Sequence, residues 1–199
     1  MPEIVLSDFV EIAHASGLPK AAKVAEIKHR GPYDPRCDFY KRLRDRVELV
    51  HQQGLPKPSL QEVLDGLRDR KKAKHYPELV RAYMKWWGRK QLRWARPPRG
   101  RFSESGIDVL VNPDVGLVLE GRPHYLKLYF KNERLSKSRV AIVTQLMELS
   151  LRDKVPADAV FGVLDVRRGR LIPAGEATMT LSACLHAELA YIASVWPNV

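Results

Sequence analysis

The chain lacks the features of a membrane-spanning or disulfide-stabilised protein. It has no apolar run near the roughly 20 residues that a membrane-spanning helix requires. Its first residues, MPEIVLSDFVEIAHASG, do not combine a basic leader with an apolar block, so we expect no secretory signal. The two cysteines, Cys37 and Cys184, lie far apart and suit reduced thiols better than a disulfide framework. These absences predict a cytoplasmic protein with no membrane partner.

Several motifs of cofactor and catalytic sites are also missing. The six histidines show no HxxxH, HxH or cysteine-paired spacing, so we expect no structural zinc site. The sequence contains no GxGxxG, no Walker loop and no GxSxG nucleophile elbow. The common signatures of dinucleotide binding, nucleotide triphosphate binding and α/β-hydrolase catalysis are therefore excluded.

Acidic residues are scarce in one stretch, Arg68–Arg101. It contains 13 Lys and Arg side chains against 2 Asp and Glu, a difference of 13 − 2 = +11, which equals the formal net charge of the whole chain. Residues 1–67 balance at 10 basic and 10 acidic residues, and residues 102–199 balance at 11 and 11. The stretch also holds three of the four tryptophans, Trp86, Trp87 and Trp94. Charge concentrated in this way indicates a polyanionic partner, with DNA or RNA ahead of an anionic membrane surface.

Residues 1–95 read as helical, and the basic stretch predicts a helix over about Pro77–Trp94. Its apolar side would contain Tyr76, Leu79, Val80, Tyr83, Trp87 and Trp94. Basic residues recur every fourth position on the other side, where like charges repel by a few tenths of a kcal/mol per pair. Pro97-Pro98 ends the helix and an exposed loop follows. We expect seven basic residues to contact phosphates: Arg81, Lys85, Arg89, Arg93, Arg96, Arg99 and Arg101. The alternative is a solvated surface helix.

The second half of the chain has the period-two pattern of strands. Strands are predicted over Ile107–Asn112, Gly116–Leu119, His124–Lys131 and Ala159–Val166, with a short return at Leu171-Ile172. Helices are predicted over Ser136–Arg152 and Leu181–Trp196, and the first of these would join two parallel strands. The predicted fold class is α/β, a mixed β-sheet flanked by helices. The predicted organisation is a helical N-terminal region over 1–67 and an α/β domain with a basic leading helix over 68–199.

A two-part motif lies within this second half. Pro113-Asp114 precedes Tyr129-Phe130-Lys131 by one strand, in the order helix-strand-strand-strand-helix-strand-helix. This arrangement resembles the PD-(D/E)XK, or restriction-endonuclease-like, superfamily over about residues 76–196. The resemblance implies Mg²⁺ or Mn²⁺ held by Asp114 and Glu120, with Lys131 or Lys127 as the catalytic lysine. The chain departs from the family pattern because Tyr129, and Tyr125 in the register of Lys127, stand where the acid should be.

Three functions remain open at this point. The first is a nucleic-acid-binding protein with a degenerate nuclease-like site, which needs no cofactor for binding. The second is a metal-dependent nuclease that uses Asp114, Glu120 and Lys131. The third is a scaffold module whose basic helix docks on an acidic protein partner or within a homo-oligomer. Other short segments, such as Lys127-Leu-Tyr-Phe-Lys131, resemble segments of uncharacterised bacterial proteins, and this resemblance implies no function.

Overall fold

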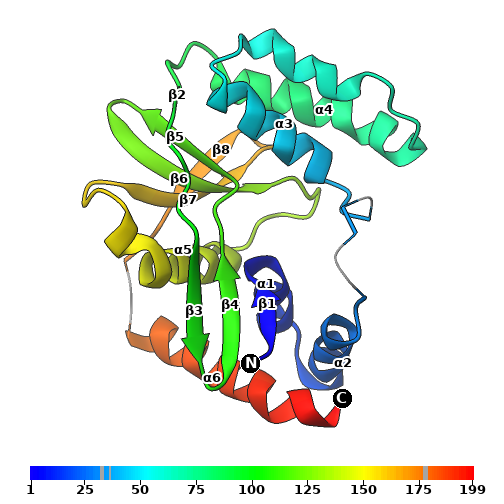
Figure 1. Cartoon of the computed structure of the whole chain (residues 1–199), viewed down its shortest axis with the longest axis vertical. Helices are drawn as coiled ribbons and strands as arrows, with labels where there is room; N and C mark the ends of the chain where they lie inside the picture. Colours follow the sequence, from blue (N-terminus) through cyan, green and yellow to red (C-terminus); the bar gives the residue numbers. More distant parts are fainter. Residues whose placement is uncertain (32–33, 36, 177–178) are drawn as a thin grey trace.

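The computed structural model describes residues 1–31, 34–35, 37–176 and 179–199 and confirms an α/β fold. It contains two mixed sheets with helices packed around them (Figure 1). The helices are α1 (Leu6–His14), α2 (Gly17–Lys28), α3 (Lys41–Gln52), η1 (Lys57–Leu64), α4 (Arg70–Trp87), α5 (Lys137–Leu151), η2 (Arg152–Lys154), α6 (Met179–Val195) and η3 (Trp196–Asn198). The strands are β1 (Glu3–Val5), β2 (Arg93–Trp94), β3 (Gly100–Glu104), β4 (Ile107–Val111), β5 (Val115–Leu119), β6 (Arg122–Tyr129), β7 (Val160–Asp165) and β8 (Arg170–Pro173).

The larger sheet has the strand order β2-β5-β6-β7-β8. Strands β5 and β6 form an antiparallel hairpin, whereas β6 and β7 run parallel, with Tyr129 opposite Asp165. Helix α5 makes the connection between these two parallel strands, as the sequence predicts. β7 is buried over almost its whole length, which explains its continuous apolar sequence.

The smaller sheet, β1-β4-β3, divides what the sequence predicts as one sheet. β4 pairs with β3 and β1, and the chain then crosses into the larger sheet, where β5 begins. Proline lacks a backbone N–H and interrupts the hydrogen-bond ladder, and Pro113 lies at this crossing. Pro97 and Pro98 lie at the matching crossing from β2 to β3. The segments β2–β3 and β4–β5 therefore each run through both sheets (Figure 1).

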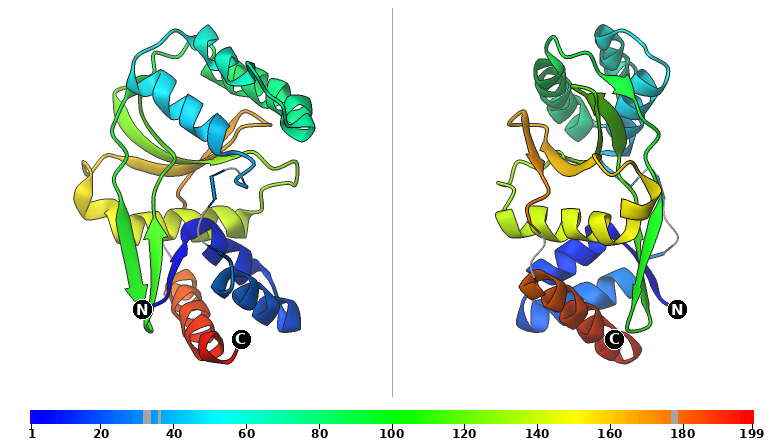
Figure 2. Two further views of the ribbon diagram at one scale, coloured as in Figure 1. Left: turned by 45° about the vertical axis from the view of Figure 1, so that its right-hand side comes forward. Right: turned by 90° about the vertical axis from the view of Figure 1, so that its left-hand side faces the viewer.

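The elements form layers around two apolar cores. Helices α3 and α4 lie on one side of the larger sheet and α5 lies on the other, with α1, α2 and α6 beyond α5 (Figure 2). One core joins α3, η1 and α4 to the larger sheet, and the other joins α1, α5 and α6 to the smaller sheet. Residues 1–67 contribute β1 as well as helices, and they pack into both cores. In the described part of the chain, none of the helices has the length and apolar character needed to cross a membrane.

The basic helix is shifted from the predicted Pro77–Trp94 to Arg70–Trp87. The Asp69 side chain caps its first turn by accepting hydrogen bonds from two backbone N–H groups. Pro77 lies inside the helix, and Gly88, with φ of 55°, ends it in a conformation that favours glycine. Because α4 ends there, the predicted arginine ladder stops at Lys85 on the helix, and Arg93 belongs to β2 instead.

Candidate nucleic-acid interface

The nuclease resemblance implies a role for four residues, and two of them, Asp114 and Lys127, lie in direct contact. Lys127 Nζ is 2.6 Å from Asp114 Oδ1, and the backbone N–H of Leu128 donates to Asp114 Oδ2 at 2.7 Å. Arg44 on α3 adds a second positive charge, with Nε 3.9 Å from Oδ1. Both oxygens of this carboxylate are therefore engaged by protein donors.

The other two of these residues, Glu120 and Lys131, lie elsewhere. Glu120 is exposed in the β5–β6 turn, at the far end of the five-residue strand β5, about 17 Å along the strand from its start beside Asp114. Lys131 donates to Glu11 at 2.7 Å, on the side of α1. Within the described residues, no group of three or more His, Cys, Asp or Glu side chains is arranged to hold a metal ion.

The two tyrosines at the acid positions pack into the protein. Tyr125 is buried in the core beneath α5, with its ring centroid 6.0 Å from that of Phe161. Tyr129 is half-buried, and its hydroxyl donates to the carbonyl of Glu133 at 3.1 Å. Burial raises the pKa of both phenols, so neither supplies the negative charge of the missing carboxylate.

The seven predicted phosphate-contacting residues are all exposed, but they come from different elements. Arg81 and Lys85 lie on the outer face of α4. Arg89 lies in the loop after Gly88, and Arg93 lies on the edge strand β2. The remaining three continue towards the smaller sheet: Arg96 and Arg99 in the β2–β3 connection and Arg101 on β3.

Two of the seven are close to acidic side chains. Arg101 pairs with Asp108 at 2.7 Å and with Glu3 at 2.9 Å, so it stabilises the smaller sheet. Arg81 lies near Glu78, whose pKa is lowered first by a hydrogen bond from Arg167 and further by the charge of Arg81. These two positions have a structural reason for a positive charge.

The other five have no such partner. We name Lys85, Arg89, Arg93, Arg96 and Arg99 the basic strip. None of their side chains forms a hydrogen bond or ion pair with the residues that the structure describes. Basic residues in the neutral flanks are often paired, as Arg152 is with Glu148 and Arg139 is with Glu11.

The backbone beneath the basic strip is held firmly. Ala95 N–H donates to Gly116 O at 3.0 Å, and a Cβ atom at Gly116 would lie 2.0 Å from the carbonyl oxygen of Ala95. This close approach requires glycine at position 116. It fixes the backbone at Ala95, which lies between Arg93 and Arg96. Trp86 is buried and Trp94 is partly buried in the core shared by α4 and the larger sheet. The tryptophans therefore anchor this surface rather than extend from it.

Two further cations join this region without having been predicted. Lys154 donates to the carbonyl of Arg99 at 3.1 Å, which places its charge beside the basic strip. Lys90 lies over the Trp86 ring, 5.1 Å from its centroid. Lys90 was recognisable as part of the basic stretch, but nothing in the sequence links Lys154 to Arg99, which lie 55 positions apart.

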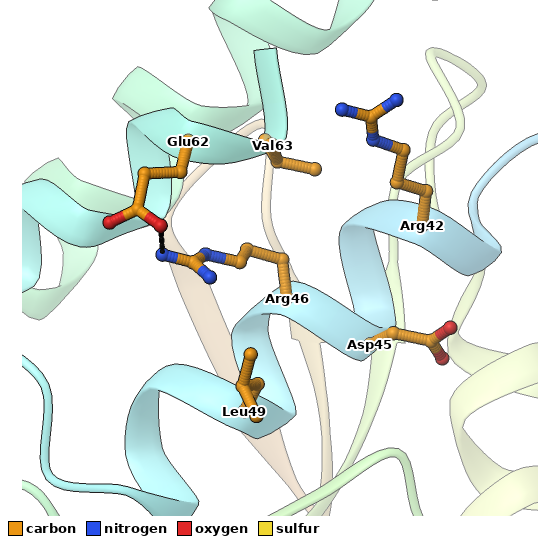
Figure 3. A pocket seen from close by; sticks show the side chains of 6 residues that line it. All are labelled: Arg42, Asp45, Arg46, Leu49, Glu62 and Val63. Carbon is orange, nitrogen blue, oxygen red and sulfur yellow. Dashed lines mark ion pairs between the residues drawn. The ribbon is translucent and has the colours of Figure 1, made fainter. Parts of the chain in front are cut away.

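A pocket lies away from these residues, between α3 and η1 (Figure 3). It has a volume of about 290 Å³, and Arg46 crosses it to pair with Glu62 at 2.5 Å. Its lining contains no predicted site residue: Arg42, Asp45, Arg46, Leu49, Glu62 and Val63. The internal ion pair satisfies its central charges, so this pocket does not resemble a site for an anion.

The chain matches no protein-family model and no curated protein sequence. The class that the fold and the surface define is an α/β protein with a localised basic surface that is unpaired within the described part of the chain.

Proposed function

We propose that the protein binds nucleic acid through the basic strip. The observation that carries this proposal is a set of five exposed cations that have no acidic partner among the described residues, on a chain whose flanks are neutral. Lys and Arg that neutralise phosphates release condensed counterions, which is the main source of sequence-independent affinity for DNA and RNA. A partner of this kind also explains why the repulsion between these side chains is left uncompensated.

The spacing of the basic strip supports a phosphate backbone as the ligand. Arg93, Arg96 and Arg99 recur every third residue, at most about 10 Å apart along an extended chain. They lie on an edge strand and its continuation, so a linear polyanion can follow them without obstruction from a neighbouring strand. An acidic protein partner would need a matching row of carboxylates.

The arrangement of the residues in the nuclease-like motif favours binding without cleavage. Asp114 is engaged by Lys127 and Leu128, Glu120 lies at the far end of β5, and tyrosines occupy the positions of the second acid. Metal-dependent hydrolysis requires carboxylates that converge on one ion. We therefore propose a binding protein that needs neither Mg²⁺ nor Mn²⁺.

Fluorescence anisotropy with labelled DNA and RNA tests this proposal. The test variant is Arg93→Gln with Arg96→Gln, and the matched control is Arg134→Gln with Lys137→Gln. Both variants remove two exposed charges and leave a net charge of +9, from the original +11 less 2. Arg134 lies in the β6–α5 connection and Lys137 is the first residue of α5. This connection lies across the molecule from the β2–β3 connection (Figures 1 and 2).

We expect the test variant to bind on the order of tens-fold more weakly at 0.1 M salt, because two phosphate contacts are lost. The control should stay within about threefold of the parent. Equal losses in the two variants would contradict a localised site, and an absence of binding at micromolar protein would contradict the function. Cleavage in Mg²⁺ that Asp114→Asn abolishes would instead establish the nuclease.

A further inference from the structure

A histidine and a serine meet where the end of α1 approaches the start of α5. His14 Nε2 lies 3.0 Å from Ser138 Oγ, although 124 positions separate the two residues in the sequence. The serine is exposed and the histidine is partly buried. A nucleophilic hydroxyl within hydrogen-bond reach of an imidazole is the basic unit of serine-dependent acyl transfer.

The hydrogen bonds of His14 define which nitrogen carries the proton. Nδ1 is 2.9 Å from the carbonyl oxygen of Val10, and a carbonyl can only accept. Nδ1 therefore donates, which leaves Nε2 of the neutral ring as an acceptor for the Ser138 hydroxyl. The Val10 carbonyl orients the imidazole in the tautomer that a general base requires.

A second serine orders the nucleophile. Ser136 Oγ lies 3.0 Å from Ser138 Oγ and accepts a hydrogen bond from the backbone N–H of Arg139 at 3.2 Å. Ser136 Oγ also lies 3.4 Å from His14 Nε2, so both serine hydroxyls surround this nitrogen, and Ser138 is the nearer of the two at 3.0 Å. The helix-capping role explains Ser136, but it leaves the alignment of Ser138 with His14 unexplained.

A pocket opens beside the imidazole. It has a volume of about 230 Å³ and is lined by Glu11, His14, Ala15, Pro19, Lys23 and Arg139. Glu11 receives hydrogen bonds from Arg139 at 2.8 Å and Lys131 at 2.7 Å. The hydrogen bond from Arg139, and to a smaller extent that from Lys131, lowers the pKa of Glu11 to about 2. The carboxylate is therefore charged at neutral pH and holds Arg139 in place.

We propose that this is a second site, in which Ser138 is the nucleophile and His14 the general base for transfer of the acyl group of a small carboxylic ester. Ser138 Oγ attacks the ester carbonyl while His14 Nε2 takes its proton. The bond to the leaving alkoxide then breaks, and His14 returns the proton to form the alcohol. Water, activated by the same imidazole, cleaves the acyl-serine and releases the acid.

The main chain supplies groups for the charge that develops on the carbonyl oxygen. Lys137 and Ser138 are the first residues of α5, where backbone N–H groups have no acceptor within the helix. Such donors stabilise the oxyanion of acyl transfer when they lie beside the nucleophile. The pocket, which His14 and Arg139 line and which Ser138 borders only through His14, is smaller than typical drug-sized sites, so only a small acyl group would fit beside the imidazole.

Labelling of the full-length protein with an alkyl fluorophosphonate tests the proposal. In this reaction Ser138 Oγ bonds to phosphorus, fluoride leaves, and His14 takes the hydroxyl proton. We expect one adduct per chain, located on Ser138 by peptide mass spectrometry. Labelling should be at least tenfold slower in His14→Gln and absent in Ser138→Ala, with melting temperatures confirming that both variants fold.

Ser16→Ala is the matched control, because Ser16 is exposed and its side chain makes no capping hydrogen bond. This variant should label at the parental rate. The parental protein should also hydrolyse p-nitrophenyl acetate at least tenfold faster than Ser138→Ala. A lack of adduct on Ser138, an unchanged labelling rate in His14→Gln, or equal ester hydrolysis in Ser138→Ala would each overturn the proposal.

Discussion

At the scale of single residues, His51 makes the fold sensitive to acid. It is 4% exposed in the core shared by α3 and α4, with Nε2 2.8 Å from the hydroxyl oxygen of Tyr83. Burial lowers its pKa to about 4, from about 6.5 in the unfolded chain. The neutral ring therefore contributes stability that is fully present above about pH 6.5 and is lost as the pH falls towards 4.

We predict that His51→Gln reduces this loss of stability. Between pH 7 and pH 4, protonation of His51 should cost the parent up to about 3 kcal/mol that the variant does not lose. At pH 7 the variant itself should be less stable, because the glutamine packs less well. Urea unfolding at both pH values measures the difference, with exposed His29→Gln as the control. Parallel pH profiles for His51→Gln and the parent would contradict a neutral buried histidine.

Residues of the candidate site were predictable from the sequence to different extents. The exposure of the basic residues follows directly from their charge. The contact between Lys127 and Asp114 is close enough in sequence to be suggested by the motif. The pairing of Lys131 with Glu11, and of Ser138 with His14, joins residues more than 100 positions apart, which no local pattern reveals.

At the scale of elements, the junction between β2 and β5 determines where the basic strip lies. Gly116 is buried opposite Ala95, and any Cβ atom there would overlap the facing carbonyl oxygen. We predict that Gly116→Ala destabilises the protein by about 1–3 kcal/mol, because the strands must separate. Thermal unfolding measures this, with exposed Gly31→Ala as the control, because no described atom lies within 4 Å of a Cβ added there. Equal melting temperatures would contradict the close approach.

The elements that the sequence predicts well are those with their own periodic pattern. The apolar stripe of Leu79, Val80 and Tyr83 identifies α4, while the alternation of β6 and the continuous apolar run of β7 identify the core of the larger sheet. β1 and β2 have three and two residues, and each is defined by pairing with a distant strand. Such short strands have too little local pattern to be recognised, so the predicted helix extended through β2.

At the scale of the whole molecule, the distribution of charge is the main feature that the fold does not explain. The two flanks are neutral and contain many ion pairs, while the basic strip carries exposed charge on a firmly held backbone. Self-repulsion of this kind destabilises a compact state unless a ligand neutralises it. The proposed nucleic-acid binding would give this surface a role, and it requires no metal ion.

The most direct test of this claim is the salt dependence of duplex DNA binding, measured by anisotropy between about 50 and 200 mM salt. The logarithm of the association constant should fall linearly with the logarithm of salt concentration. The slope should become shallower by about 2 in Arg93→Gln with Arg96→Gln, since each phosphate contact contributes about 0.9. It should not change in Arg134→Gln with Lys137→Gln. A parental slope near zero, or the same change in both variants, would contradict phosphate binding by the basic strip.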